Sequence, residues 1–287
     1  MTRSRVVLAD GMTLSLTEWH DAPSSATTTA TTTREPVVLL HGLGDASGVW
    51  LGIAPWLLAQ RRVLGVDLRG HGESAWSGEC DYRTDTHVRD LAGLLDVIGL
   101  ERVTLVGHSL GGAVALAYAA RFPRRVGNLV IVDHGPEVAE ASSASILDAI
   151  RESCRVYPGR DDFAAVLHAR HPLGDAGLLT RIAATLVRDV SCGGFMVKHD
   201  PAVVRDAEPS SAAADDRDDT WGQLRRLRAR TLIVRGMASS VLPRAVACRM
   251  LESIDAEAHL ETIRMAGHSV HLDNTTALRE SLVRFLA

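Results

Sequence analysis

The sequence of 287 residues has little cysteine, few aromatic residues and no long apolar run. Its four cysteines are widely separated and form no CxxC pair, so neither a disulfide framework nor a zinc site is expected. Aromatic residues make up 4% of the chain, which argues against a sugar-stacking groove. No segment reaches the run of about 18 apolar residues that a helix needs to cross a bilayer. These absences exclude a disulfide-rich secreted domain and a membrane-spanning protein.

The charge balance also has no strong sign, with a formal net charge of −4. We therefore expect neither nucleic acid nor an anionic membrane as a partner, and we expect a small-molecule substrate. The first residues contain no apolar core of the kind that a secretory signal needs. Together with the isolated cysteines, this predicts a cytoplasmic protein. The composition does not indicate an oligomeric state.

Short apolar runs and stretches of helical spacing alternate along most of the chain. Residues 5–9 and 12–19 flank Asp10-Gly11 and predict a β-hairpin. Further predicted strands are residues 37–40, 62–66, 102–106, 128–132, 231–234 and 259–263. Predicted helices cover residues 50–60, 86–98, 244–253 and 276–286, and another ends at residue 120. Strands that alternate with helices predict a mostly parallel sheet covered by helices on both faces.

This alternation stops after Gly135-Pro136 and resumes at residue 231. The segment between contains several helical stretches and no clear buried strand, so we predict a core domain of residues 1–136 and 229–287 with a helical lid at 137–228. The lid is expected over the carboxyl edge of the sheet, where ligands bind in such folds. Phe195 and Met196 are candidates for the substrate pocket, although packing within the lid explains each as well. Residues 24–33 are low-complexity and predict a surface loop.

A tight glycine-flanked turn at Gly107-His-Ser-Leu-Gly111 follows one predicted strand and opens a helix. Such a turn strains its central residue and needs small neighbours, and it projects a serine hydroxyl above the sheet edge. The helix N-terminus beneath it favours developing negative charge. The pattern predicts Ser109 as a nucleophile.

His41-Gly-Leu-Gly44 follows another strand, and its glycines let backbone N–H groups point into a cavity. Acyl transfer needs two such donors for the oxyanion, and the N–H groups of Leu43 and Leu110 are the natural pair. A plain glycine turn is the alternative for this segment.

A serine hydroxyl is a poor nucleophile at neutral pH and needs a neighbouring base, most often histidine. His268 lies in the loop after the last strand, where it can reach over the sheet edge, and the order of serine before histidine fits. His271 is the local rival, but we expect it at the start of the final helix.

Together His41–Gly44, Gly107–Gly111 and Gly267–His271 resemble the α/β-hydrolase superfamily along nearly the whole chain. Residues 67–74 also match its pattern, and we expect a structural role for them, since Asp67 and Arg69 can pin a long loop. Residues 132–137, 196–201 and 266–273 look like the lidded branch of esterases, lactonases and carbon–carbon hydrolases. The resemblance implies the α/β-hydrolase fold with a lid after the sixth strand, a serine–histidine–acid triad, no metal and no organic cofactor.

The sequence departs from this family at the triad acid. Relatives usually carry it within a segment like Arg235–Pro243, where no Asp or Glu occurs here. Asp133 ends the strand expected beside that of Ser109, so its carboxylate starts at the same sheet edge, and some members of the family use this position. Asp133 is therefore the predicted acid. The alternatives are a turn cap at Asp133, a role for Glu137, or no acid at all.

These features predict a hydrolase that cleaves a carboxylic ester, lactone or thioester through an acyl-enzyme on Ser109. A carbon–carbon bond hydrolase, or another cofactor-free reaction in which His268 deprotonates a ketone-like substrate, is the alternative among enzymes. A non-enzymatic ligand receptor on this fold is the alternative outside them. Haloalkane dehalogenases and epoxide hydrolases are disfavoured, because they need a carboxylate where this chain has Ser109.

Overall fold

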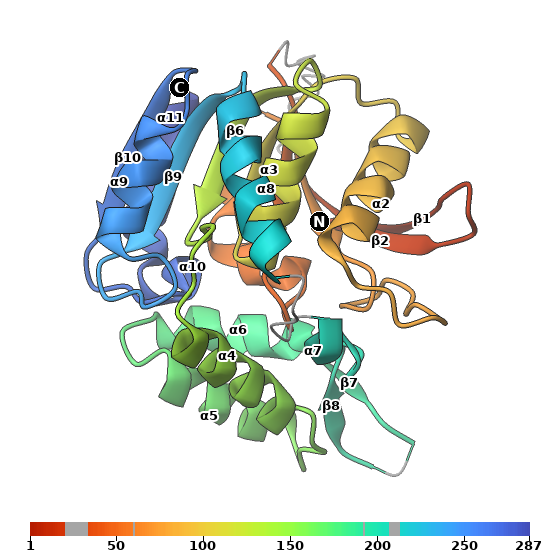
Figure 1. The fold of residues 1–287 in the computed structure, drawn as a ribbon. Helices are drawn as coiled ribbons and strands as arrows, with labels where there is room; N and C mark the ends of the chain where they lie inside the picture. Colours follow the sequence, from red (N-terminus) through yellow and green to blue (C-terminus); the bar gives the residue numbers. More distant parts are fainter. Residues whose placement is uncertain (21–33, 60, 192, 207–212) are drawn as a thin grey trace.

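An eight-stranded sheet forms the centre of the molecule in the computed structural model, which describes residues 1–20, 34–59, 61–191, 193–206 and 213–287 (Figure 1). The strands are β1 (Thr2–Val7), β2 (Thr13–Trp19), β3 (Val37–Leu40), β4 (Val63–Asp67), β5 (Val103–His108), β6 (Val126–Val132), β9 (Arg230–Gly236) and β10 (Ala258–Ile263). Their order is β1-β2-β4-β3-β5-β6-β9-β10. The hairpin β1–β2 is antiparallel, β2 joins β4 in antiparallel fashion, and the other neighbours are parallel. The predicted mostly parallel sheet is confirmed, and the predicted loop at 24–33 lies outside the described residues.

The central strands are apolar on both faces because both faces are covered. Along β6, Leu129 and Ile131 belong to one hydrophobic cluster, and Val130 and Val132 belong to the other. Side chains alternate between the two faces of a strand, so a strand buried on both sides reads as a continuous apolar run. This explains why the sequence identified these strands well.

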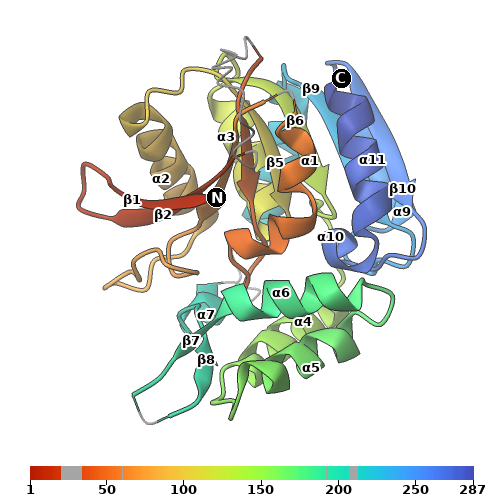
Figure 2. The same ribbon diagram turned by 180° about the vertical axis from the view of Figure 1, so that it is seen from behind.

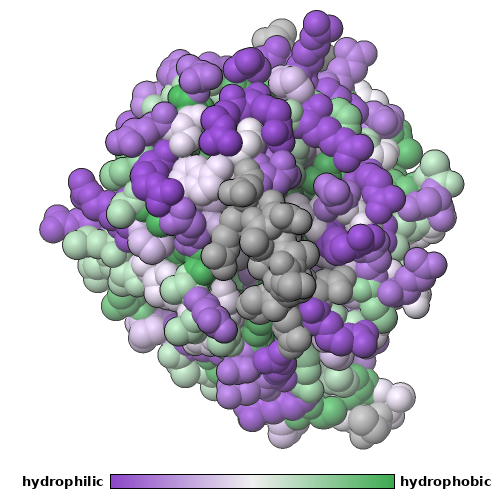
Figure 3. Space-filling model, in the orientation of Figure 1, coloured by the Kyte–Doolittle hydropathy of each residue, from purple (hydrophilic) through white to green (hydrophobic). Residues whose placement is uncertain are grey.

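Helices cover the two faces in separate groups (Figures 1 and 2). One face carries α2 (Thr84–Val97), α3 (Leu110–Arg121), α8 (Ala213–Arg226) and α9 (Arg244–Glu252). The other carries the 3₁₀ helix η1 (Ser47–Gly52), α1 (Ala54–Leu57), α10 (Val270–Asp273) and α11 (Thr275–Leu286). Hydrophobic residues are scattered among hydrophilic ones on the face shown in Figure 3. Within the described residues, no helix is long and apolar enough to cross a membrane.

The helix predicted at residues 50–60 is instead split into η1 and the short α1. Pro55 stands in the first turn of α1. Proline has no N–H and cannot continue a preceding helix, but it fits well at a helix start. Pro55 therefore explains why one predicted helix is two elements in the structure.

A second group of elements lies at one end of the sheet, below it in Figure 1. It consists of α4 (Glu140–Ser153), α5 (Arg160–Arg170), α6 (Ala176–Leu186), β7 (Val187–Asp189), β8 (Phe195–Val197) and α7 (Val203–Asp206), and we call residues 140–206 the lid. The short antiparallel pair β7–β8 was not predicted, because three residues are too few to give a pattern. Helix α8 falls within the lid predicted at residues 137–228, but in the structure it packs against α3 beside the sheet.

Gly111 is needed where α3 passes close to β3. A Cβ at Gly111 would lie 2.4 Å from the carbonyl oxygen of Leu40, which is a backbone atom and cannot rotate away as a side chain could. We predict that Gly111→Ala lowers the free energy of unfolding by about 3 kcal/mol, since only a shift of β3 from α3 relieves the overlap. Gly93→Ala in α2 is the matched control, because its Cβ meets nothing nearer than Leu8 at 3.7 Å. The control should gain about 0.5–1 kcal/mol, the usual benefit of alanine in a helix. Urea denaturation measures both, and equal stability of the two variants would contradict the prediction.

Candidate active site

Ser109 occupies a strained turn between β5 and α3. Its backbone has φ 50° and ψ −115°, a region that non-glycine residues rarely enter. The turn is also crowded, since a Cβ on Gly107 would lie 2.1 Å from the carbonyl oxygen of Gly111. The glycines on both sides therefore make the turn possible, and the turn lifts the Ser109 side chain into a cavity beneath the lid.

Ser109, His268 and Asp133 form one chain of hydrogen bonds. The Nε2 atom of His268 lies 3.1 Å from Ser109 Oγ, and its Nδ1 atom lies 2.9 Å from a carboxylate oxygen of Asp133. An ionised carboxylate only accepts hydrogen bonds, so Nδ1 carries the proton and the lone pair of Nε2 faces the serine hydroxyl. The three residues follow β5, β10 and β6, and their side chains meet at the carboxyl edge of the sheet.

The Asp133 carboxylate is fully buried and has two further donors besides His268. Its Oδ1 accepts from the N–H of Gly236 at 2.9 Å, and its Oδ2 accepts a short bond from the hydroxyl of Ser239. Gly236 ends β9, and Ser239 lies in the loop after it, where relatives of the resembled family usually carry the acid. Ser239 belongs to the segment Arg235–Pro243, which has no Asp or Glu, and its hydroxyl donates to the carboxylate that follows the neighbouring strand.

The two rival residues are not part of this hydrogen-bond chain. His271 is fully buried in α10 and packs against Trp50, with ring centroids 5.2 Å apart. Glu137 pairs with Arg249 at the surface, with 2.9 Å between Oε1 and Nη2. Neither is hydrogen-bonded to the Ser109–His268 pair within the described part of the chain.

Two backbone donors flank Ser109. Leu110 is the first residue of α3, and Leu43 follows β3 on a turn in which Gly44 has φ +80°. Among the described residues, neither N–H group donates to an acceptor. Both residues adjoin the cavity, Leu43 in its wall and Leu110 directly after Ser109. The arrangement can receive a negatively charged oxygen.

Three buried histidines hold the loop that carries Leu43, which the sequence did not predict. His71 Nε2 accepts from the N–H of Gly44 at 3.1 Å, and His199 in the lid donates through Nδ1 to the Gly44 carbonyl at 3.1 Å. His41 Nε2 accepts from the N–H of Leu68 at 2.9 Å. Burial lowers the pKa of all three imidazoles, that of His199 to about 4, so each is neutral and can accept a bond.

The loop at residues 67–74 is held as expected of a structural element. Asp67 accepts from the N–H groups of Ser47 and Glu73 at 2.7 and 3.0 Å. Arg69 forms a buried two-pronged ion pair with Asp90 at 2.5 and 2.6 Å. These contacts hold the loop that contains His71, whose Nε2 accepts the hydrogen bond from the N–H of Gly44.

The cavity above Ser109 has a volume of about 270 Å³. Its lid side is mostly apolar and includes Ile146 and Ile150 of α4 and Phe163 and Leu167 of α5. Arg170 is the only Arg or Lys among the described residues that line it.

Phe195 and Met196, the predicted pocket residues, are not among the described residues that line this cavity, and Val197 at the end of β8 takes their place. The ring of Phe195 instead lies under the guanidinium of Arg160 at 4.9 Å. Met196 pairs with Arg188 across the hairpin. Of the three residues of β8, only Val197 lines the cavity, and the sequence alone could not distinguish the three because it did not predict the hairpin.

The comparisons with known proteins agree with this architecture. A family model described as alpha/beta hydrolase fold matches residues 35–275. The chain is 30% identical over 290 residues to the 2-hydroxy-6-oxo-2,4-heptadienoate hydrolase of Pseudomonas putida, covering 99% of this chain and 96% of that protein. It also matches an uncharacterised Mycobacterium tuberculosis protein at 41% identity over 99 residues, 34% of this chain and only 29% of that protein's length.

Among solved structures, an E-2-(acetamidomethylene)succinate hydrolase superposes with a TM-score of 0.84 at 22% identity, covering 99% of this chain and 98% of that one. At this identity the likeness concerns the fold.

Asp45, in the cavity wall, has a carboxyl group without a hydrogen bond or ion pair to the described residues. Burial raises its pKa to about 7. The folded protein therefore keeps this proton up to about neutral pH, while the unfolded chain releases it near pH 4. Stability contributed by the proton is present below pH 4 and is lost as the pH rises toward 7. We predict that Asp45→Asn raises the melting temperature at pH 8 more than at pH 4. Thermal unfolding in EDTA-containing buffers measures this, and an equal change at both pH values would contradict it.

Proposed function

The chain belongs to the α/β-hydrolase fold family, and on that premise we propose that it hydrolyses a carboxylic ester, lactone or thioester through an acyl-enzyme on Ser109. The observation that carries the proposal is the hydrogen-bond chain of Ser109, His268 and Asp133, with distances of 3.1 and 2.9 Å. A serine alone is unreactive at neutral pH, and a histidine held in the correct tautomer supplies the missing base.

In the first half of the reaction, Ser109 Oγ attacks the substrate carbonyl carbon and its proton passes to Nε2 of His268. Asp133 stabilises the resulting imidazolium through the bond to Nδ1. The carbonyl oxygen becomes negative and is received by the N–H groups of Leu43 and Leu110, at the positive end of α3. The carbon–oxygen or carbon–sulfur bond then breaks, and the leaving group takes the proton from His268.

In the second half, water attacks the acyl-enzyme. His268 accepts a proton from the water, the tetrahedral species collapses, and Ser109 recovers its proton as the acid product leaves. Each step uses the same two donors and the same base, so one geometry serves both halves.

Substrate choice belongs, in this proposal, to the lid. Helices α4 and α5 supply the apolar wall opposite Ser109. A pocket of this kind favours a compact apolar acyl group, and the wall excludes water from the acyl-enzyme between steps.

A second candidate is hydrolysis of a carbon–carbon bond in an oxo-dienoate. Two observations favour it: the Pseudomonas putida relative is a 2-hydroxy-6-oxo-2,4-heptadienoate hydrolase, and Arg170 in the cavity wall offers a cation to a substrate carboxylate. Turnover of an aryl ester and of a 2-hydroxy-6-oxo-dienoate on the same preparation separates the candidates. A preference for the dienoate in kcat/KM that falls in Arg170→Gln, without a fall for the aryl ester, would assign the second function.

Removing the nucleophile tests the acyl-enzyme proposal. We predict that Ser109→Ala lowers kcat by about 10⁴–10⁶, the usual cost of losing one triad member, while the variant stays folded. A fluorophosphonate should label the wild type and not the variant, which tests the reactivity of Ser109 independently of turnover. Retention of more than about a tenth of wild-type kcat would rule out the serine mechanism, and the absence of labelling in the wild type would favour a ligand receptor.

A further inference from the structure

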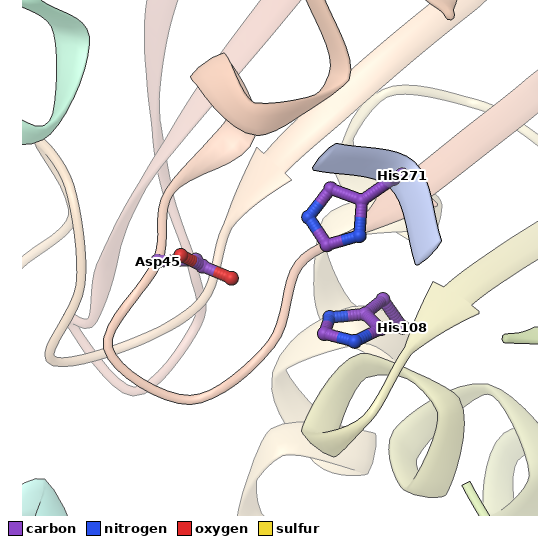
Figure 4. Close-up of side chains that lie close together, drawn as sticks. All are labelled: Asp45, His108 and His271. Atoms are coloured by element: carbon purple, nitrogen blue, oxygen red, sulfur yellow. The ribbon is translucent and has the colours of Figure 1, made fainter. Parts of the chain in front are cut away.

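Three side chains that the proposed reaction does not use, those of Asp45, His108 and His271, lie close together (Figure 4). Asp45 comes from the loop after β3, His108 from the end of β5, and His271 from α10. One ligand atom of each lies within 4.8 Å of the others. Gly42 leaves room for them, since a Cβ there would lie 2.7 Å from His108 Nδ1 and 3.2 Å from a carboxylate oxygen of Asp45. Groups from three distant segments therefore face one small space.

The two imidazoles in this cluster have ring nitrogens without partners. His108 donates from Nε2 to the carbonyl oxygen of His268 at 3.0 Å, so its Nδ1 carries a lone pair. Among the described residues, His108 Nδ1 and both ring nitrogens of His271 have no hydrogen-bond partner, and both side chains are buried. A buried polar atom without a partner costs about 1–3 kcal/mol, so such atoms usually have a ligand.

Two imidazoles and one carboxylate are a donor set that suits divalent transition metals. An imidazole nitrogen without a hydrogen-bond partner can offer its lone pair to a cation, and His108 and His271 each have such a nitrogen facing the cluster. The bond from His108 Nε2 to a backbone carbonyl is the second contact that metal-bound histidines usually make, and it aims Nδ1 into the cluster. Asp45 and His108 also line the cavity, which gives an ion a route from solvent.

We propose that Asp45, His108 and His271 bind a divalent transition metal ion of the Zn²⁺ class, and that the bound ion inhibits the hydrolase. The ring of His108 lies next to that of His268, with centroids 4.8 Å apart and the ring planes tilted by 44°. A divalent cation on His108 disfavours the positive charge that His268 acquires when it takes the Ser109 proton. The bound ion is thus an inhibitor of the reaction, and catalysis does not require it. This site goes beyond the proposed function and was not expected from the sequence, which has no clustered metal-binding motif.

Cobalt binding tests the site without an activity measurement. Protein freed of metal by EDTA and dialysis is titrated with Co²⁺, and the visible d–d absorption of the bound ion is followed. We expect saturation at one equivalent. Asp45→Asn and His271→Gln should each weaken binding at least about tenfold, the range for disturbing a metal site. Circular dichroism checks the fold of each variant, and Asp45→Asn, at the cavity wall, keeps the test decisive if His271→Gln does not fold.

Cys154→Ser is the matched control, because Cys154 and His199 form another pair of side chains that could bind a metal ion, with 3.2 Å between Sγ and Nε2. The control should bind Co²⁺ as tightly as the wild type. A sulfur-to-cobalt charge-transfer band that disappears in Cys154→Ser would move the ion to that pair and overturn the proposal. No saturable binding, or wild-type affinity in Asp45→Asn, would overturn it as well and leave a buried water as the partner of these nitrogens.

Ester turnover tests the inhibition separately. Zn²⁺ should inhibit the wild type reversibly, EDTA should restore activity, and Asp45→Asn should need at least about ten times more Zn²⁺, in line with its weaker site. Bound Co²⁺ with unchanged turnover would overturn the inhibitory role. If metal-free protein shows no hydrolysis, the proposed function fails while the cobalt titration still decides the site.

Discussion

The buried carboxylate of Asp133 is the group on which the rest of the site depends. Taking a carboxylate out of water costs several kcal/mol, and a buried charge is stable only when its oxygens are hydrogen-bonded. Here Gly236, Ser239 and His268 all donate to it. Hydrogen bonds to charged groups contribute about 1.5–3 kcal/mol each, so three of them offset the cost of burial. One charge thereby ties the ends of β6, β9 and β10 together and fixes the tautomer of His268.

This arrangement explains how a carboxylate directly after β6 can serve as the proposed acid, although the family usually carries it after the adjacent strand β9. Neighbouring strands lie about 4.8 Å apart, so a carboxylate one strand closer to Ser109 still starts at the same edge. Asp133 has φ 49°, a backbone conformation that is uncommon for a side-chain-bearing residue. The end of β9 and the loop after it still contribute to the site, because Gly236 and Ser239 supply hydrogen-bond donors where the family usually has an acceptor.

Sequence reasoning predicted the parts of this protein that local pattern determines. Apolar runs located the central strands, because both faces of the sheet are buried. The glycine-flanked turn identified Ser109, and the strand neighbour relation suggested Asp133, which the structure brings to His268. Contacts between distant segments could not be predicted. The donor role of Ser239, the support of Gly44 by His71 and His199, and the cluster of Asp45, His108 and His271 all join residues that no spacing rule connects. The hairpin β7–β8 was missed for a related reason, and with it the position of Phe195 and Met196 away from the cavity.

The turnover of Asp133→Asn tests this account most directly. The asparagine fills the same space, but its NH₂ group can donate to His268 Nδ1, which moves the ring proton to Nε2. In that tautomer Nε2 cannot accept the Ser109 proton. Glu137→Gln is the matched control, since Glu137 pairs with Arg249 at the surface. The account predicts that kcat of Asp133→Asn falls by about 10²–10⁴ in a folded protein while the control keeps wild-type turnover. Wild-type kcat in a folded Asp133→Asn variant would contradict it.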